Sequence, residues 1–195
     1  ISLVPFAVIA ETIDRQSPQG FSKTQFHTQK ALTPVTTDRL ASRKRGQRFV
    51  EFRGEMAYFP GNTVLRHGFL GPDGEPDEYE AVAFQPRHGP VGLLVGNIVP
   101  YPSMLGVYPW DDWTSAVQAY RIKINKRQHK RLIALINRTR AEKKLFYLYT
   151  DNCVRFVRDA AREIGLKAPE QTFIVPAVYV KMLRIANQRR APQLQ

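Results

Sequence analysis

The sequence predicts an α+β domain in which an antiparallel sheet packs against helices. Short apolar runs at residues 48–53, 64–70 and 79–84 lie close together along the chain, and a dense turn segment separates the last two, as is typical of antiparallel strands. Segments with a helical period of apolar residues follow after residue 125. With 195 residues and 43% hydrophobic content, the chain can bury one sizeable core.

Residues 1–46 are predicted to be an N-terminal arm or linker of unknown role, and residues 47–195 the folded domain. The first ten residues are apolar, but no basic segment precedes them and no Ala-x-Ala site closes them. We interpret them as a buried strand or docking segment, with a remnant of a signal or of an upstream domain as the alternative. Residues 11–46 are polar without a sustained period, which indicates loop or extended arm.

The runs 64–70 and 79–84 are expected to pair as a hairpin, because the segment 71–77 between them is rich in Gly, Pro and Asp. A hairpin centred near Gly74 places His67 opposite Ala81, give or take one residue, so Glu80 is a neighbour of His67. Since a slip of one residue turns every side chain to the other face, this register is the least secure part of the prediction.

Residues 86–116 contain many Gly and Pro, and we expect a long structured loop in which Trp110 and Trp113 either line a substrate groove or bury the loop. The remaining elements are predicted as a strand at 117–124, an amphipathic helix at 126–141, a short extended run at 146–149, a helix at 151–164 and a last helix from Pro176 to about Asn187. Thr150 or Asp151 is expected to begin the helix at 151–164, and Gly165 to end it.

Cys153 is the only cysteine, so the chain has no internal disulfide and no zinc site of several thiolates. It lies in the first turn of the helix predicted at 151–164. There the unpaired N–H groups and the helix dipole are expected to lower the pKa of the thiol and to hold an oxyanion. Its spacing from Val157 turns it toward the sheet. The alternative is a small buried apolar residue without chemistry.

The segment Asp151-Asn152-Cys153-Val154-Arg155-Phe156-Val157 resembles the Asn-Cys-x-x-Phe-Val box of circularly permuted NlpC/P60-type, papain-like cysteine hydrolases. That superfamily also contains the lecithin:retinol acyltransferase-like proteins. Residues 66–70 are similar to the family's histidine strand and residues 80–86 to its second strand, and the likeness covers about residues 48–188. It implies a permuted papain-like fold, an antiparallel sheet packed against the cysteine-bearing helix.

The resemblance also implies a catalytic set in which Cys153 is the nucleophile, His67 the base and Glu80 the residue that orients the imidazole. Glu78 and Gln85 are the alternatives for the orienting residue, and His88 is an alternative base or orienter. Asn152 either caps the helix or helps to position an oxyanion, and capping is the simpler role. His27 and His129 are expected to be solvated. The four histidines form no i, i+4 pair and hence no metal motif, and the chemistry requires no cofactor.

The implied activity is hydrolysis of an amide or peptide bond through a thioester, with bacterial peptidoglycan as the expected substrate. A net charge of +12 suits an anionic cell wall. The resemblance implies an exported protein rather than a cytoplasmic one, and a secreted antibacterial effector with an immunity or delivery partner is one form that it could take. The alternatives are a lipid acyl hydrolase or transferase, a protein deamidase, or a non-catalytic basic module that binds nucleic acid or an acidic partner. Nucleic acid is the less favoured polyanion, because the basic residues are scattered. No run of apolar residues is long enough for a membrane span.

Overall fold

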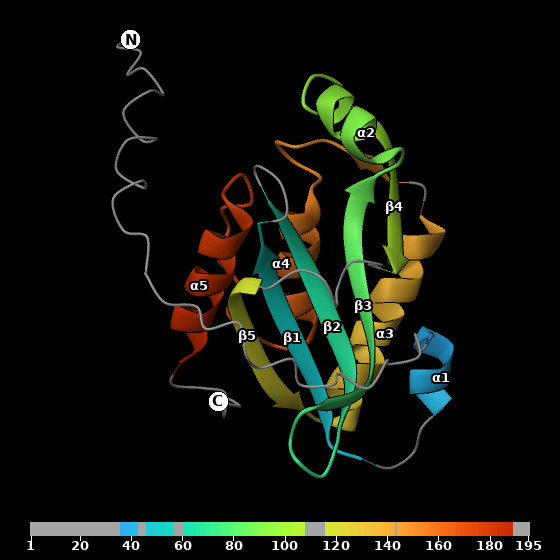
Figure 1. Cartoon of the computed structure of the whole chain (residues 1–195), viewed down its shortest axis with the longest axis vertical. Helices are drawn as coiled ribbons and strands as arrows, with labels where there is room; N and C mark the ends of the chain where they lie inside the picture. Colours follow the sequence, from blue (N-terminus) through green and yellow to red (C-terminus); the bar gives the residue numbers. More distant parts are fainter. Residues whose placement is uncertain (1–35, 43–45, 57–60, 108–115, 143, 189–195) are drawn as a thin grey trace, which may run out of the picture. The chain divides into compact units, whose positions relative to one another are not determined.

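A six-stranded antiparallel sheet with the strand order β5-β1-β2-β3-β4-β6 organises the part of the chain that the structure describes (Figure 1). The computed structural model describes residues 36–42, 46–56, 61–107, 116–142 and 144–188, all within the unit Leu32–Gln195. The strands are β1 (Arg48–Glu55), β2 (Asn62–Leu70), β3 (Pro76–Pro86), β4 (Tyr101–Val107), β5 (Ala116–Ile124) and β6 (Leu145–Phe146). The helices are α1 (Thr37–Ser42), α2 (Gly89–Gly96), α3 (Lys126–Ala141), α4 (Cys153–Glu163) and α5 (Pro176–Asn187).

The main core lies between one face of the sheet and the helices α3, α4 and α5 (Figure 1). Alternate residues of a strand point to the same face, so Phe52, Leu65 and Val82, which are paired across β1, β2 and β3, all enter this core. Helix α5 covers β5 and β1, α4 covers β2 and β3, and α3 contacts β4. The α+β class predicted from the sequence is therefore confirmed, and the strand β1 lies between two partners rather than at an edge.

The predicted hairpin of β2 and β3 is present, with its register displaced by one residue. His67 pairs with Glu80, whereas a symmetric turn centred on Gly74 would have placed it opposite Ala81. The physical reason is the position of the turn: Leu70 pairs with Pro76, which centres the turn on Asp73 and not on Gly74, and the irregularity between Phe69 and Leu70 then shifts the pairing by one position and brings His67 opposite Glu80. Consequently His67 and Glu80 are direct neighbours on the same face of the sheet.

The helices predicted at 126–141 and from Pro176 to Asn187 begin and end where the sequence places them. Helix α3 has a capping box, in which Asn125 accepts from the Gln128 N–H and the Gln128 side chain accepts from the Asn125 N–H. The N-cap prediction for α4 was wrong by one residue or two. Asn152, and not Thr150 or Asp151, caps α4, and Gly165 ends it with a positive φ of 87°.

The prediction of a long loop at 86–116 was wrong for two of its parts. This segment contains the helix α2 and the strand β4, which pairs with β3 along residues 82–86. The abundant Gly and Pro masked both elements, because such residues ordinarily interrupt helices and strands. Trp110 and Trp113 lie outside the described residues, as do residues 1–35 of the predicted arm and with them His27.

Helix α1 lies inside the segment predicted to be an arm, yet it packs on the domain. Leu40 is fully buried against Phe69, and Thr37 is buried beside Glu80. The folded part therefore begins before residue 47, and a short helix of the preceding segment belongs to it.

The face of the sheet turned away from the helices carries buried charges. Glu51 is 2% exposed and forms ion pairs with Arg53, Arg66 and Arg121, and Arg53 also pairs with the buried Glu55. A buried carboxylate is tolerated when several cations share it, because together they replace its lost hydration. Glu51, Arg53 and Glu55 occupy alternating positions of β1, and Glu51 pairs directly with Arg66 of β2 and Arg121 of β5.

Candidate functional site

Cys153 is the first residue of α4, at the end of the helix that contacts β2. Its helix start is rigidly held, because the Asn152 side chain accepts from the Arg155 N–H and donates to the carbonyls of Leu148 and Thr172 at 2.6 and 2.9 Å. The capping role expected for Asn152 is confirmed, and its amide is fully occupied by these contacts. Cys153 itself is partly exposed and packs against the main core.

The Cys153 thiol does not have the lowered pKa that its position in the chain predicts. Burial raises the pKa of the thiol above its ordinary value, because protein atoms enclose the sulfur even though part of the residue reaches solvent. Contacts with Thr63 and with the N–H groups of Val154 and Cys153 lower the pKa but do not offset this effect. At neutral pH the group is therefore a thiol in this arrangement, and the expectation of a dipole-stabilised thiolate was wrong.

His67 lies fully buried in a different cluster, with both ring nitrogens facing other side chains. Its Nδ1 is 3.3 Å from Nε2 of His129, and its Nε2 is 3.3 Å from Oε2 of Glu80, near enough for an ion pair although not aligned as a hydrogen bond. Burial, with His67 and Arg48 nearby, lowers the pKa of His129 to about 3. His129 is 3% exposed, so the expectation that it is solvated was wrong.

Glu80 holds this cluster to the rest of the domain. Its carboxylate accepts from the Thr37 hydroxyl of α1 and, at 2.6 Å, from the Arg140 guanidinium of α3. Burial raises the Glu80 pKa, but the contacts with His67, Thr37 and Arg140 outweigh it and hold the pKa below its ordinary value. A carboxylate shared by one strand and two helices fits a role in tertiary packing.

The structure brings His67 and Glu80 together, but the contacts of Cys153 are elsewhere on the strand. Cys153 contacts Thr63, which precedes His67 by four residues on the same face of β2. Four residues of a strand span about 13 Å. No hydrogen bond among the described residues joins the thiol to His67, whose ring nitrogens face His129 and Glu80. A papain-like dyad of these two residues is not assembled in this arrangement.

The other candidates also lie apart from Cys153. His88 is exposed at the start of α2, where it adopts a left-handed conformation with φ 64° and contacts the Tyr101 hydroxyl at 2.9 Å. Glu78 lies 3.6 Å from Arg39 at the surface, and Gln85 is a half-buried residue of β3 that pairs with Met104 of β4. Neither provides a partner for His67 in the place of Glu80.

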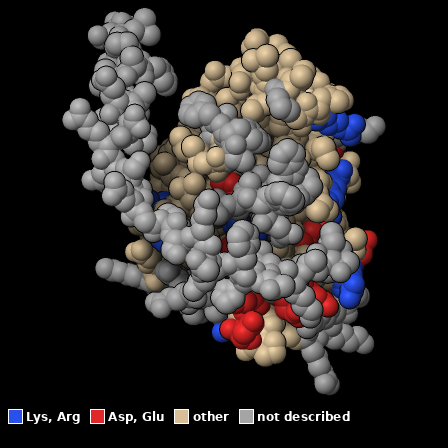
Figure 2. Space-filling view, in the orientation of Figure 1, with Lys and Arg blue, Asp and Glu red and all other residues tan. Residues whose placement is uncertain are grey.

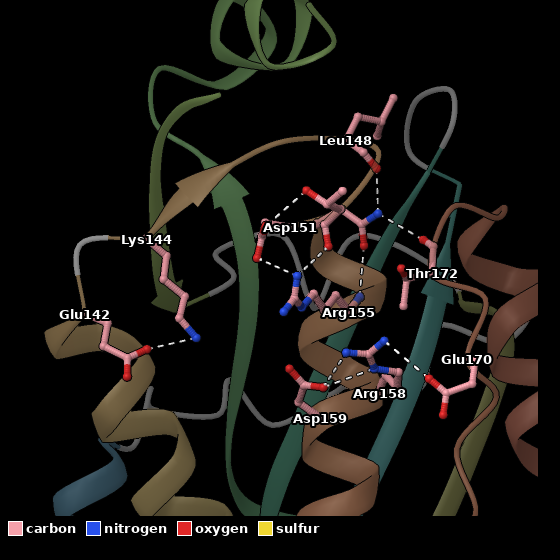
Figure 3. Close-up of polar contacts among 11 residues, drawn as sticks. Glu142, Lys144, Leu148, Asp151, Arg155, Arg158, Asp159, Glu170 and Thr172 are labelled. Carbon is pink, nitrogen blue, oxygen red and sulfur yellow. Dashed lines mark hydrogen bonds and ion pairs between the residues drawn. The ribbon is translucent and has the colours of Figure 1, made fainter. Parts of the chain in front are cut away.

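A small pocket of about 30 Å³ lies between the end of α3 and the start of α4. Ion pairs of Arg155 with Asp151 and of Lys144 with Glu142 surround it, and Figure 3 shows further pairs of Arg158 along α4. The pocket holds about one water molecule and has no room for a peptide or glycan chain. The described residues contain no group of three His, Cys, Asp or Glu side chains arranged to hold a metal ion.

The outer side of α3 forms a second candidate site. Five cations of this helix are exposed, and we call them the α3 basic face: Lys126, Arg127, Lys130, Arg131 and Arg138. The helix contains no acidic residue, and none of the ion pairs found among the described residues includes a member of this face. By contrast, Arg140 and the arginines of α4 are all paired with carboxylates.

Two cations of the α3 basic face lie against the dipole at the start of α3. Lys126 and Arg127 lie in its first turn, where the positive end of the helix dipole repels a cation by about 0.3–1 kcal/mol each. This end of α3 packs on the end of α4, since the Gln128 side chain donates to the Ile164 carbonyl at 2.8 Å. The α3 basic face therefore begins at the end of the sheet away from Cys153, which starts α4.

Sequence reasoning missed His129 and Thr63. A signal for His129 was present, because it precedes Leu132 and Ile133 by three and four residues and so shares their buried side of α3. For Thr63 no signal was available, because its contact with Cys153 depends on where α4 lies against β2. Comparisons with family models, curated proteins and solved structures find no match for this chain.

Proposed function

We propose that this chain is a basic binding module that attaches to a linear phosphodiester polyanion through the α3 basic face. The observation that carries the proposal is that this helix face has five exposed cations while the helix has no acidic residue. None of the five cations forms an ion pair with another described residue. Solvated surfaces ordinarily mix the two signs of charge, and a cation in the first turn of a helix opposes the dipole. The arrangement thus costs stability, and a bound anion would offset that cost.

The dimensions of the α3 basic face suit a polymer better than a small anion. Residues four apart on a helix rise by about 6 Å, and the distance along the axis from Lys126 to Arg138 is about 18 Å. A single phosphate would meet one or two of these cations, whereas a chain of phosphates would meet all of them. If all five contact phosphates of a single strand, the slope of log K against log salt concentration is about −3.5.

The proposal is tested by fluorescence anisotropy with a labelled 20-nucleotide poly(dT), with poly(glycerol phosphate) and with neutral dextran, each over a range of salt concentrations. The first two probes are both phosphodiester polymers. A comparison of them shows whether the chain prefers a nucleic acid or a cell-wall polymer. We expect binding to at least one of them and none to dextran. Lys126→Glu/Lys130→Glu should weaken binding at least about tenfold and flatten the salt slope for the single strand by about 1.4.

The matched control is Lys167→Glu/Lys181→Glu, which makes the same change of charge at two exposed lysines outside the α3 basic face. A general effect of net charge would weaken both double variants alike. The proposal fails if the two variants lose the same affinity, or if the unmodified chain binds neither phosphodiester probe.

A cysteine-dependent hydrolase or acyltransferase is the second proposal. One observation in its favour is that Cys153 is partly exposed at the first residue of α4. Another is an aromatic pair, Tyr149 and Phe173, whose ring centres are 4.7 Å apart and which follow the two residues, Leu148 and Thr172, that the Asn152 side chain contacts. In this proposal the thiol forms a thioester with an amide or ester carbonyl, peptidoglycan peptide bonds being the expected substrate, and a base other than His67 takes its proton.

Iodoacetamide labelling of Cys153 against pH tests this second proposal. A catalytic thiol reacts faster than a free thiol at neutral pH, and Cys153→Ala abolishes turnover. The raised pKa described above predicts the opposite, slow labelling that accelerates in urea. Slow labelling, together with unchanged turnover in Cys153→Ala, would exclude the cysteine proposal and leave polyanion binding untouched.

A further inference from the structure

The helix α2 turns its large apolar side chains outward. Val91 and Leu94 of α2 and Ile98 in the turn that follows it have the spacing of one helical face, and 63%, 68% and 74% of their surfaces are exposed. Val99 beside them is also exposed. A helix on a protein surface ordinarily presents polar residues to water, so α2 has the reverse pattern.

The glycines of α2 explain why this pattern cannot be relieved by rotation of the helix. A Cβ atom at Gly92 would lie 2.0 Å from the Arg87 carbonyl oxygen, and one at Gly96 would lie 2.8 Å from the Phe146 ring. The helix is therefore seated on its glycine side, with Leu93 packed against the main core. Its exposed apolar face is a consequence of a close and specific docking.

Two cations and a tyrosine surround the base of this apolar tip. Arg87 donates through Nε to the Ser103 carbonyl at 3.2 Å, and the Ser103 hydroxyl donates to the Lys144 carbonyl at 2.6 Å, so both basic residues lie beside Ser103. Tyr101 contacts His88 at the start of α2. Residues 89–100 contain no Asp, Glu, Lys or Arg, and Figure 2 shows an uncharged region where α2 projects beyond β3 and β4, with basic side chains below it at the edge.

We infer that α2 is a membrane-surface anchor for a bilayer with anionic lipid headgroups. Val91, Leu94 and Ile98 enter the outer acyl region, Arg87 contacts the lipid phosphates, and Tyr101 lies at the headgroup level. The Lys144 ammonium is paired with Glu142 and is not counted among these contacts. The interaction is peripheral, since none of the described helices is long and apolar enough to span a bilayer. An uncharged tip with cations at its base, on a chain of net charge +12, complements such a surface in both polarity and charge.

A bilayer fits this tip better than a second protein does. Burial of an aliphatic side chain removes about 60–120 Å² from water, so the four exposed residues supply roughly 250–480 Å². A stable protein interface needs about 800 Å² from each partner. Membrane association requires no such minimum area, because the surface charge adds to a shallow insertion. The inference does not depend on polyanion binding by α3, which uses other residues.

Flotation of the full chain with vesicles of phosphatidylcholine, with or without about 30% phosphatidylglycerol, tests the inference. We expect binding to the anionic vesicles and little to the neutral ones. Leu94→Gln/Ile98→Gln should lower the partition coefficient for anionic vesicles at least about tenfold. The thermal midpoint of unfolding should not change, because both side chains are exposed. The matched control Val178→Gln/Ile185→Gln makes the same change at exposed apolar residues of α5 and should bind as the unmodified chain does.

A second readout is independent of affinity. A tryptophan introduced as Leu94→Trp should show a blue shift of fluorescence with anionic vesicles, and Val178→Trp should show none. The inference is overturned if Leu94→Gln/Ile98→Gln floats with vesicles to the same extent as the control variant does. It is also overturned if the unmodified chain binds neither kind of vesicle. Concentration-dependent dimerisation that this double variant abolishes, without vesicle binding, would also overturn it and assign the tip to a second copy of the chain. Loss of vesicle binding in Lys126→Glu/Lys130→Glu alone would assign the membrane contact to α3 instead.

Discussion

Acid should destabilise this domain through His129, well above the pH at which carboxylates become protonated. The pKa of His129 falls from an ordinary 6.5 to about 3 in the fold, through burial first and then through His67 and Arg48. The folded state therefore binds fewer protons than the unfolded state between these values. Stability is fully present above pH 6.5 and is lost as the pH falls toward 3.

At pH 5 the expected loss from this one group is about 2 kcal/mol, because the unfolded imidazole is already protonated over 1.5 pH units and each unit is worth about 1.4 kcal/mol. Glu80, which faces the same cluster, adds a loss of the same sign only below its ordinary pKa of 4.5. Glu80 therefore adds no loss between pH 6.5 and pH 4.5. Arg140 and Arg48, the other charged groups near the cluster, do not titrate there.

Urea unfolding followed by circular dichroism at pH 7.5 and pH 5 measures this loss in the unmodified chain, in His129→Gln and in His88→Gln. His129→Gln retains a polar side chain toward His67 but cannot titrate, so its pH dependence should be smaller by about 2 kcal/mol. His88→Gln removes an exposed histidine and should keep the full dependence. If His129→Gln loses as much stability at pH 5 as the unmodified chain does, the assignment of the acid sensitivity to His129 is refuted.

Three further substitutions test the packing around the sites. Glu51→Ala leaves three arginines without their shared carboxylate and should cost about 3–5 kcal/mol of unfolding free energy, whereas Glu75→Ala, with a side chain 63% exposed, should cost less than about 1 kcal/mol. Asn152→Ala removes the cap of α4 and should cost about 2 kcal/mol, against a change within about 0.5 kcal/mol for the exposed Asn137→Ala; equal losses in urea unfolding would contradict the capping account. Gly92→Val should cost about 1–3 kcal/mol and accelerate amide exchange in α2, and unchanged exchange would show that the helix is not seated on its glycine side.

Much of the fold could be predicted from the sequence, because local patterns decide it. The boundaries of α3 and α5 follow from an apolar period and from residues that begin or end helices, and the hairpin of β2 and β3 follows from its turn. Helix α2 could not be predicted, because its rigid seating depends on Gly92 and Gly96 meeting Arg87 and Phe146, which are contacts made only in the folded chain.

The candidate catalytic site shows the same limit. The start of α4 at Cys153 and the pairing of His67 with Glu80 are both local features, and the sequence predicts each of them closely. Whether the thiol meets the imidazole depends on how far along β2 the helix lies, and this is decided by tertiary packing. The helix start lies at Thr63, four residues from His67, so two local predictions that were each close to the structure did not combine into a dyad.

Functional sites tend to be the places where a sequence departs from its own local rules, because stability there is exchanged for activity. Cys153 is not such a place: its helix is well capped, its sulfur is enclosed, and the burial that raises its pKa suits a packing role. The α3 basic face and the apolar tip of α2 do depart from those rules, one with cations against a helix dipole and the other with aliphatic side chains facing water. Neither departure is compensated within the described residues, and the proposed ligands, a polyanion and a lipid surface, would each offset one of them. For this reason we propose binding ahead of thiol chemistry.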